Sequence, residues 1–284
     1  MVATVFSQGR FNMRKVLLAT TALVALNVSA ASADISISGN MEFEYLSTST
    51  SDDMKTDGNV IIVASKTTDS GLTFSVTQNN TLMSAGVEDA YITISSPEMG
   101  TLQLGQGDDI FDRMDGALGE NNDIESDQLP AGASTDMAGS AMAVNYMSPS
   151  IGGLKLGVYA DSDNDETGFA FNYSMAGVNL YYGTKEDQSN LGASASFAGF
   201  KINVGSRKVD NTSEKAADVG VSYVLGNGIK VAALSSRGTT SGGTKVKYSN
   251  IGAQYTIADG VTAQIEQADN DGTNSTWLGL TVSF

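Results

Sequence analysis

The chain has 284 residues, a net charge of −16 at neutral pH, and neither cysteine nor histidine. Without these two residue types, disulfides, thiolate nucleophiles, imidazole bases and the usual zinc sites are excluded, and so is Ser-His-Asp or Cys-His catalysis. Because acidic residues outnumber basic ones, the chain is not suited to neutralise the phosphates of a nucleic acid, and no nucleic acid partner is expected.

The first 33 residues are typical of a secretory signal peptide. A basic pair at residues 14–15 precedes an apolar stretch at residues 16–28 and an Ala-Ser-Ala signal at residues 31–33. The apolar stretch is shorter than the roughly 20 residues of a spanning helix, which makes a membrane anchor the less favoured alternative. We expect an over-extended start, cleavage after Ala33 and a mature chain of residues 34–284.

Alternation of apolar and polar residues then continues to the end of the chain. Between Ile35 and Tyr45 every second residue is polar, whereas helical spacing from Ile35 gives no apolar stripe. Turn signals divide the pattern into sixteen predicted strands, at residues 35–46, 58–67, 72–80, 86–96, 100–106, 139–147, 153–161, 167–175, 177–185, 190–197, 199–208, 215–225, 228–236, 244–256, 260–268 and 273–284.

The connections between these strands alternate between two kinds. Seven are short and carry glycine, as in hairpin turns, and eight are mostly longer and acidic or rich in Ser and Thr. All short turns and both termini should therefore lie at one end. Aromatic residues gather near that end, as in the interfacial girdle of a membrane barrel: Tyr146, Tyr173, Phe197, Phe200, Tyr223, Tyr255 and Phe284. Aromatic residues also favour strands in general, which is the alternative reading.

Together these features favour an all-β fold, a 16-stranded antiparallel transmembrane β-barrel, over a soluble β-sandwich. The one long connection, residues 107–138, follows the fifth strand and is strongly acidic. Inside a barrel its carboxylates would concentrate cations in a confined aqueous path. A solvated surface loop is the alternative. The predicted pore constriction comprises Asp108, Asp109, Asp112, Arg113, Asp115, Glu120, Asp123, Glu125 and Asp127.

The alternation of inward and outward side chains along the strands also predicts which residues line the wall of the lumen. Its predicted members are Glu42, Glu44, Lys155, Lys201, Arg207, Lys230 and Lys247. Tyr248 does not share the parity of the apolar series from Ile251 to Ile257, which predicts a β-bulge near residues 249–250. The segment Asp161–Glu166 is similar to the start of an EF-hand but lacks its turn glycine. Acidic loops could hold Ca²⁺ or Mg²⁺ loosely, although a solvated loop is favoured, and no other cofactor is expected.

Three segments resemble the general porins of Gram-negative outer membranes, particularly the alphaproteobacterial branch. They are DISISGNMEFEY at residues 34–45, GTLQLGQ at residues 100–106 running into the acidic third loop, and WLGLTVSF at residues 277–284. The resemblance implies a sixteen-stranded barrel whose third loop folds into the lumen, usually a homotrimer, with passive diffusion of small hydrophilic solutes. It also implies both termini in the periplasm, contact with outer-membrane lipid and lipopolysaccharide, and recognition of Phe284 by the assembly machinery.

The chain departs from the family pattern of a basic wall opposite the acidic loop, because only Lys55 and Lys66 are basic between residues 34 and 112. We therefore expect a non-enzymatic, cation-selective diffusion channel for ions and small solutes. One alternative is a structural or adhesive outer-membrane barrel without an open pore. Another is an outer-membrane hydrolase, which would need paired carboxylates or a lysine base, and no motif supports either.

Overall fold

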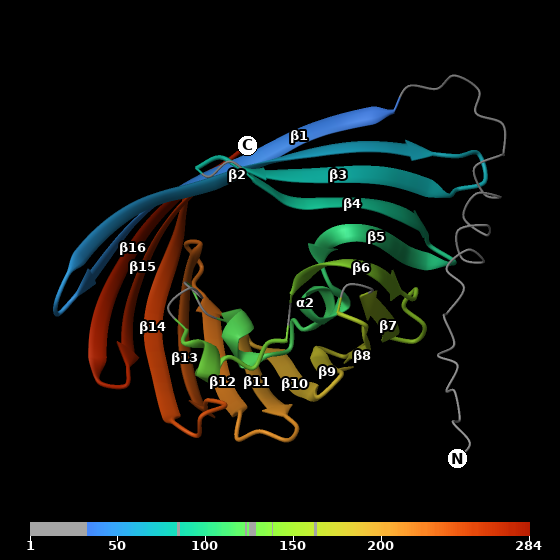
Figure 1. Ribbon diagram of the computed structural model, residues 1–284. Helices are drawn as coiled ribbons and strands as arrows, with labels where there is room; N and C mark the ends of the chain where they lie inside the picture. The colour runs from blue at the N-terminus through green and yellow to red at the C-terminus, as the bar shows by residue number, and fades with distance from the viewer. Residues whose placement is uncertain (1–32, 84–85, 123, 125–128, 138, 162–163) are drawn as a thin grey trace, which may run out of the picture. The chain divides into compact units, whose positions relative to one another are not determined.

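The computed structural model describes residues 33–83, 86–122, 124, 129–137, 139–161 and 164–284. In these residues each strand pairs antiparallel with its neighbours in sequence, and β1 also pairs with β16, so that the sheet closes into a barrel (Figure 1). The strands are β1 (Asp34–Thr48), β2 (Asp52–Thr67), β3 (Thr73–Thr81), β4 (Gly86–Ser96), β5 (Gly100–Asp108), β6 (Ser140–Met147), β7 (Leu154–Asp161), β8 (Glu166–Met175), β9 (Val178–Lys185), β10 (Gln188–Phe197), β11 (Phe200–Val209), β12 (Lys215–Val224), β13 (Ile229–Thr239), β14 (Lys245–Ala258), β15 (Val261–Asn270) and β16 (Thr273–Ser283). The predicted sixteen-stranded barrel is confirmed, and the predicted signal peptide lies outside the described residues apart from Ala33.

The two faces of the sheet have opposite polarity. Large apolar side chains such as Val158, Leu191 and Ile251 are 54 to 64% exposed on the outer face. Polar side chains such as Asn145 and Asn203 are buried on the inner face. A soluble protein rarely exposes so continuous an apolar surface, so the outer face is suited to contact with lipid. Among the described residues no helix is long and apolar enough to cross a membrane.

The short connections are tight hairpin turns. Ala176–Gly177 and Ala198–Gly199 both have positive φ at each residue, as two-residue type I′ turns require. Next to the second of these turns, the Phe200 ring stacks on Phe197 and contacts Tyr223 in a tilted arrangement, with ring centroids 6.0 and 4.5 Å away. This aromatic group lies where an interfacial girdle was predicted.

Strands β1 and β2 are longer than predicted. β1 continues to Thr48 and β2 begins at Asp52 rather than at residue 58, with Asp52 paired opposite Ser47. Strands that run beyond the lipid can be polar on both faces, so the hydrophobic pattern does not reveal these ends.

The predicted bulge near residues 249–250 is wrong. Tyr248 points to the inner face, where its hydroxyl donates a 3.0 Å hydrogen bond to Glu266, while Ile251 and Tyr255 share the outer face. The residues therefore have consistent parity, and the register shift lies instead between Thr256 and Ala258.

Candidate functional site

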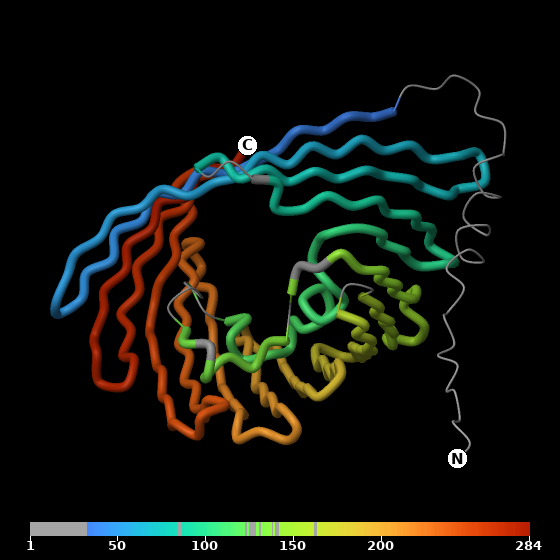
Figure 2. The backbone as a smooth tube through the Cα atoms, in the orientation of Figure 1, coloured from blue at the N-terminus to red at the C-terminus, as the bar shows by residue number. Residues whose placement is uncertain are grey.

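The described residues between β5 and β6 lie inside the ring of strands (Figure 2). It forms the short helix α2 (Ile110–Met114) and the 3₁₀ turns η1 (Gly119–Asn122) and η3 (Ala131–Ala133). Asp109 caps α2, since its carboxylate accepts hydrogen bonds from the amides of Phe111 (2.8 Å) and Asp112 (3.2 Å). We call the described residues of this connection, 109–122, 124, 129–137 and 139, the inner segment. It contacts β7, β8 and β11–β14.

Two apolar clusters attach the inner segment to the wall. Phe111 and other residues of α2 pack with Tyr159 and Tyr181, and the Phe111 and Tyr159 rings lie 5.7 Å apart. The second cluster joins Ala133 to Leu234 and Tyr248. Because these contacts bury apolar side chains that would otherwise face water, they hold both ends of the segment against the barrel.

Polar wall residues satisfy the backbone of the inner segment. The Asp218 carboxylate on β12 accepts hydrogen bonds from the amides of Gly119 and Glu120, each at 3.0 Å, and from the Thr135 hydroxyl at 2.6 Å. The Asn203 amide donates to the carbonyl of Leu118 at 2.8 Å. The sequence analysis did not identify Asp218 and Asn203 as anchors, although the alternation along their strands places both side chains on the inner, polar face.

Eight successive strands leave room for the inner segment by carrying a glycine that faces it. A Cβ at Gly220 would lie 2.1 Å from the Gly119 carbonyl oxygen, and a Cβ at Gly238 would lie 1.7 Å from that of Gly132. The eight glycines are Gly157, Gly168, Gly183, Gly192, Gly205, Gly220, Gly238 and Gly252, one each on β7 to β14. These glycines can be recognised in the sequence by their inward-facing positions, but the sequence analysis did not use them.

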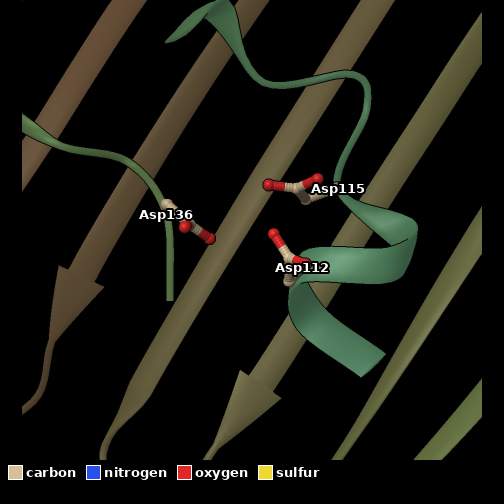
Figure 3. A group of neighbouring side chains, drawn as sticks. All are labelled: Asp112, Asp115 and Asp136. Atoms are coloured by element: carbon tan, nitrogen blue, oxygen red, sulfur yellow. The ribbon is translucent and has the colours of Figure 1, made fainter. Parts of the chain in front are cut away.

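Three carboxylates of the inner segment converge. Oxygen atoms of Asp112, Asp115 and Asp136 all lie within 4.8 Å of one another, and the side chains point toward a common centre (Figure 3). They border a cavity of about 420 Å³ that Glu120 also lines. Asp136 falls within the acidic connection at residues 107–138 but is not among the predicted constriction residues. Such a cluster concentrates negative charge inside the barrel to the extent that its carboxyl groups are ionised.

Burial and mutual repulsion hold several of these carboxyl groups partly protonated near neutral pH. Burial, together with the nearby Asp136 and Asp112, raises the pKa of Asp115 to about 8. Burial and the charges of Asp136 and Asp218 raise the pKa of Glu120 to about 7. Burial and the charges of Asp108 and Asp136 raise the pKa of Asp112 to about 6. The negative charge of the site therefore grows across the physiological pH range.

The remaining predicted constriction residues are placed differently. Burial raises the pKa of Asp109 to about 7, but its carboxylate serves as the helix cap. Asp108 ends β5 with its side chain exposed, and the Arg113 guanidinium donates to the Gln103 side-chain carbonyl. The other three lie outside the described residues: Asp123, Glu125 and Asp127.

Six of the predicted wall residues share the inner face. Glu44 is 6% exposed and accepts a 2.9 Å hydrogen bond from the Trp277 indole, and its carboxylate pairs with Lys55 at 3.2 Å. Glu42 accepts a 3.0 Å hydrogen bond from the Thr281 hydroxyl. The basic members on this face by strand parity are Lys155, Lys201, Arg207 and Lys230. Lys155, Lys201 and Lys230 each occupy the second position of a strand that follows a short turn, so they do not gather opposite the acidic cluster. Arg207 pairs with Glu214.

The placement of Lys247 on the lumen wall is wrong. Val246 and Tyr248 are the inward residues, because Val246 approaches Gly132 and Tyr248 belongs to the second apolar cluster. Lys247 therefore points outward, opposite Arg237 of β13. The error arose from treating Tyr248 as an outward aromatic residue.

Comparisons with known proteins agree with this architecture. The model of the Gram-negative porin family matches residues 19–275. A double mutant of Rhodobacter blastica porin matches over 88% of this chain and 100% of its own, with 19% identity and a TM-score of 0.73. A loop-deletion mutant of OmpT, an outer membrane protein of Vibrio cholerae, matches over 89% and 100%, with 12% identity and a TM-score of 0.74. No curated protein sequence matches the chain.

Proposed function

Because this chain belongs to the Gram-negative porin family and so forms an outer-membrane channel, we propose that it is a cation-selective pore for passive diffusion of ions and small hydrophilic solutes. The inner segment narrows the water-filled lumen, and its carboxylates set the selectivity. Low-dielectric walls focus the field of these charges along the path, which raises the local concentration of cations.

The observation that carries this proposal is the convergence of Asp112, Asp115 and Asp136 on one cavity inside the barrel. Two further acidic side chains, Glu42 and Glu44, lie on the inner wall. The predicted wall lysines Lys155, Lys201 and Lys230 stand next to short turns, and the inward Lys55 and Lys185 at the other end pair with Glu44 and Glu166. The balance of charge along the path therefore favours cations over anions.

The family also suggests the setting of the channel. We propose a homotrimer without enzymatic activity, with both termini and all short turns in the periplasm and the longer connections facing outward. Assembly would depend on recognition of the terminal Phe284, and the outer face would contact lipid and lipopolysaccharide. Loose retention of Ca²⁺ or Mg²⁺ at the acidic loops stays a prediction.

Neutralising the cluster tests the proposal. The variant Asp112→Asn/Asp115→Asn/Asp136→Asn should lower the cation-to-anion permeability ratio, measured from reversal potentials in a salt gradient across planar bilayers. A matched control neutralises three carboxylates in short turns: Asp69→Asn, Glu98→Gln and Asp259→Asn. An unchanged ratio in the first variant, with folded protein and measurable conductance, would contradict the proposal.

A further inference from the structure

The acidic connection carries one cationic side chain, which stands beside the three converging carboxylates. Residues 107–138 contain a single basic residue, Arg113. It lies on α2 directly after Asp112 and two residues before Asp115, and its side chain is exposed. We call Asp112, Asp115 and Asp136 the acidic cluster (Figure 3). A guanidinium so close to carboxylates is expected to pair with one of them, because charge-assisted hydrogen bonds are about twice as strong as neutral ones.

Arg113 does not pair with the acidic cluster. Among the residues that the structure describes, it takes part in no ion pair. Its guanidinium instead donates to the side-chain carbonyl oxygen of Gln103, a neutral residue of β5. Adjacent residues of a helix point in different directions, so the contact with β5 turns Arg113 away from Asp112. A positive charge thus stands inside the barrel without closing an ion pair on the cluster.

Gln103 is itself held in one orientation. Its side chain is 1% exposed, and its amide nitrogen donates a 3.1 Å hydrogen bond to the backbone carbonyl of Asp108. Gly107 leaves room for this contact, because a Cβ there would lie 3.2 Å from the same nitrogen. A glutamine side chain has one donor end and one acceptor end. Since the donor end is bound to Asp108, the acceptor oxygen is presented to Arg113.

We propose that Gln103 is a positioning residue of the channel, which holds the Arg113 guanidinium on β5 and so keeps the acidic cluster open to passing cations. This inference rests on the cation selectivity given in the proposed function. Without the Gln103 oxygen, the field of the cluster draws the guanidinium toward Asp112 and Asp136. One carboxylate charge of the constriction is then compensated from within the chain, and fewer cations are concentrated there.

The reversal potential of the full protein in a salt gradient across planar bilayers, measured at pH 9, tests this proposal. At this pH the carboxyl groups of Asp112 and Asp115, with pKa values raised to about 6 and about 8, are mainly ionised. Gln103→Leu keeps the size of the side chain but removes the acceptor, and it should lower the cation-to-anion permeability ratio by about two- to threefold. Gln103→Met also lacks the amide and should give the same result, which keeps the test decisive if the leucine variant does not fold.

Three further variants separate positioning from a purely structural role. Gln103→Glu loses the donor to Asp108, as Gln103→Leu does, but keeps an acceptor for Arg113 and should not lower the ratio. In an Arg113→Gln background, Gln103→Leu should cause no further change, because no guanidinium is left to move. The matched control Gln106→Leu removes another amide of β5, which donates a 3.1 Å hydrogen bond to the Glu88 carbonyl, and should keep the wild-type ratio.

An unchanged ratio in folded, conducting Gln103→Leu or Gln103→Met would overturn the proposal. An equal loss in Gln103→Glu, in Gln106→Leu or in the Arg113→Gln background would do the same. The coupling between positions 103 and 113 can be measured whichever ion the wild type prefers. A pore without cation preference would therefore contradict the proposed function, whereas a cation-selective pore without this coupling would refute this inference alone.

Discussion

The carboxylate of Asp218, on β12, accepts a 2.6 Å hydrogen bond from the hydroxyl of Thr135 in the inner segment. The same carboxylate accepts the amide hydrogens of Gly119 and Glu120. One buried side chain of the wall thus binds both the start of η1 and a residue beyond η3, and fixes the two relative to each other.

Removal of this anchor should loosen the constriction. In Asp218→Ala two amides and a hydroxyl lose their acceptor, which should cost about 2 kcal/mol or more of stability. Single-channel conductance should rise, and thermal unfolding should begin at a lower temperature. The control Asp259→Ala removes an exposed carboxylate of a short turn and should change neither. Wild-type conductance in Asp218→Ala would show that the anchor does not hold the inner segment.

A side chain at Gly238 should displace the inner segment directly. Alanine there would place its Cβ 1.7 Å from the Gly132 carbonyl oxygen, so the backbone at η3 must shift. We expect Gly238→Ala to destabilise the protein by about 1 to 3 kcal/mol and to change conductance. In Gly226→Ala the new Cβ meets no atom within 4 Å, so this variant provides the control. Equal unfolding midpoints for the two variants would contradict the packing described here.

Cation selectivity should depend on pH. The pKa values of Asp112, Glu120 and Asp115 are raised to about 6, 7 and 8, so the cluster gains negative charge as the pH rises through this range. Reversal potentials should show a cation preference that increases from pH 5 to pH 9, and Asp115→Asn should flatten the upper part of the curve. A constant permeability ratio over this range would contradict the expected titration.

The same groups predict the sign of the pH dependence of stability. A carboxyl pKa that is higher in the folded chain means that the folded state binds protons more tightly than the unfolded state. The contribution of these groups to stability should therefore be greatest at low pH and should be lost as the pH rises from about 4 to about 8. Unfolding midpoints of wild type and Asp115→Asn across this range would measure the effect.

Two lysines test the assignment of faces. Lys230 points inward and Lys247 points outward, and a change to glutamine removes one positive charge in either case. We expect Lys230→Gln to increase the cation preference slightly, because the charge lies along the aqueous path. Lys247→Gln should leave the permeability ratio unchanged. A changed permeability ratio in Lys247→Gln, with an unchanged ratio in Lys230→Gln, would contradict this assignment and show that Lys247 faces the lumen.

The sequence predicted the barrel well because its signal is local. Apolar and polar residues alternate along each strand, and glycine marks the short turns. The number of strands could therefore be predicted without information on long-range contacts. Apart from the ends of β1 and β2, the errors arose where one residue was assigned to the wrong face. Treating Tyr248 as outward led both to the wrong position of Lys247 and to a bulge that the register does not contain.

The details of the site were harder to predict because they depend on contacts between distant parts of the chain. Asp136 reaches Asp112 and Asp115 only when the inner segment folds back along the wall. The raised pKa values follow from burial, which charge counting along the sequence ignores. By contrast, the inward glycines from Gly157 to Gly252 could have located the path of the segment, since one glycine per strand at inward parity marks a close approach.

The most direct test of the channel is the reversal potential of the wild-type protein in a planar bilayer with a tenfold KCl gradient at pH 7.5 to 8. A water-filled barrel narrowed by acidic side chains predicts steady conductance and a reversal potential of the sign set by K⁺. A sealed bilayer despite inserted protein, or a reversal potential of the sign set by Cl⁻, would contradict it.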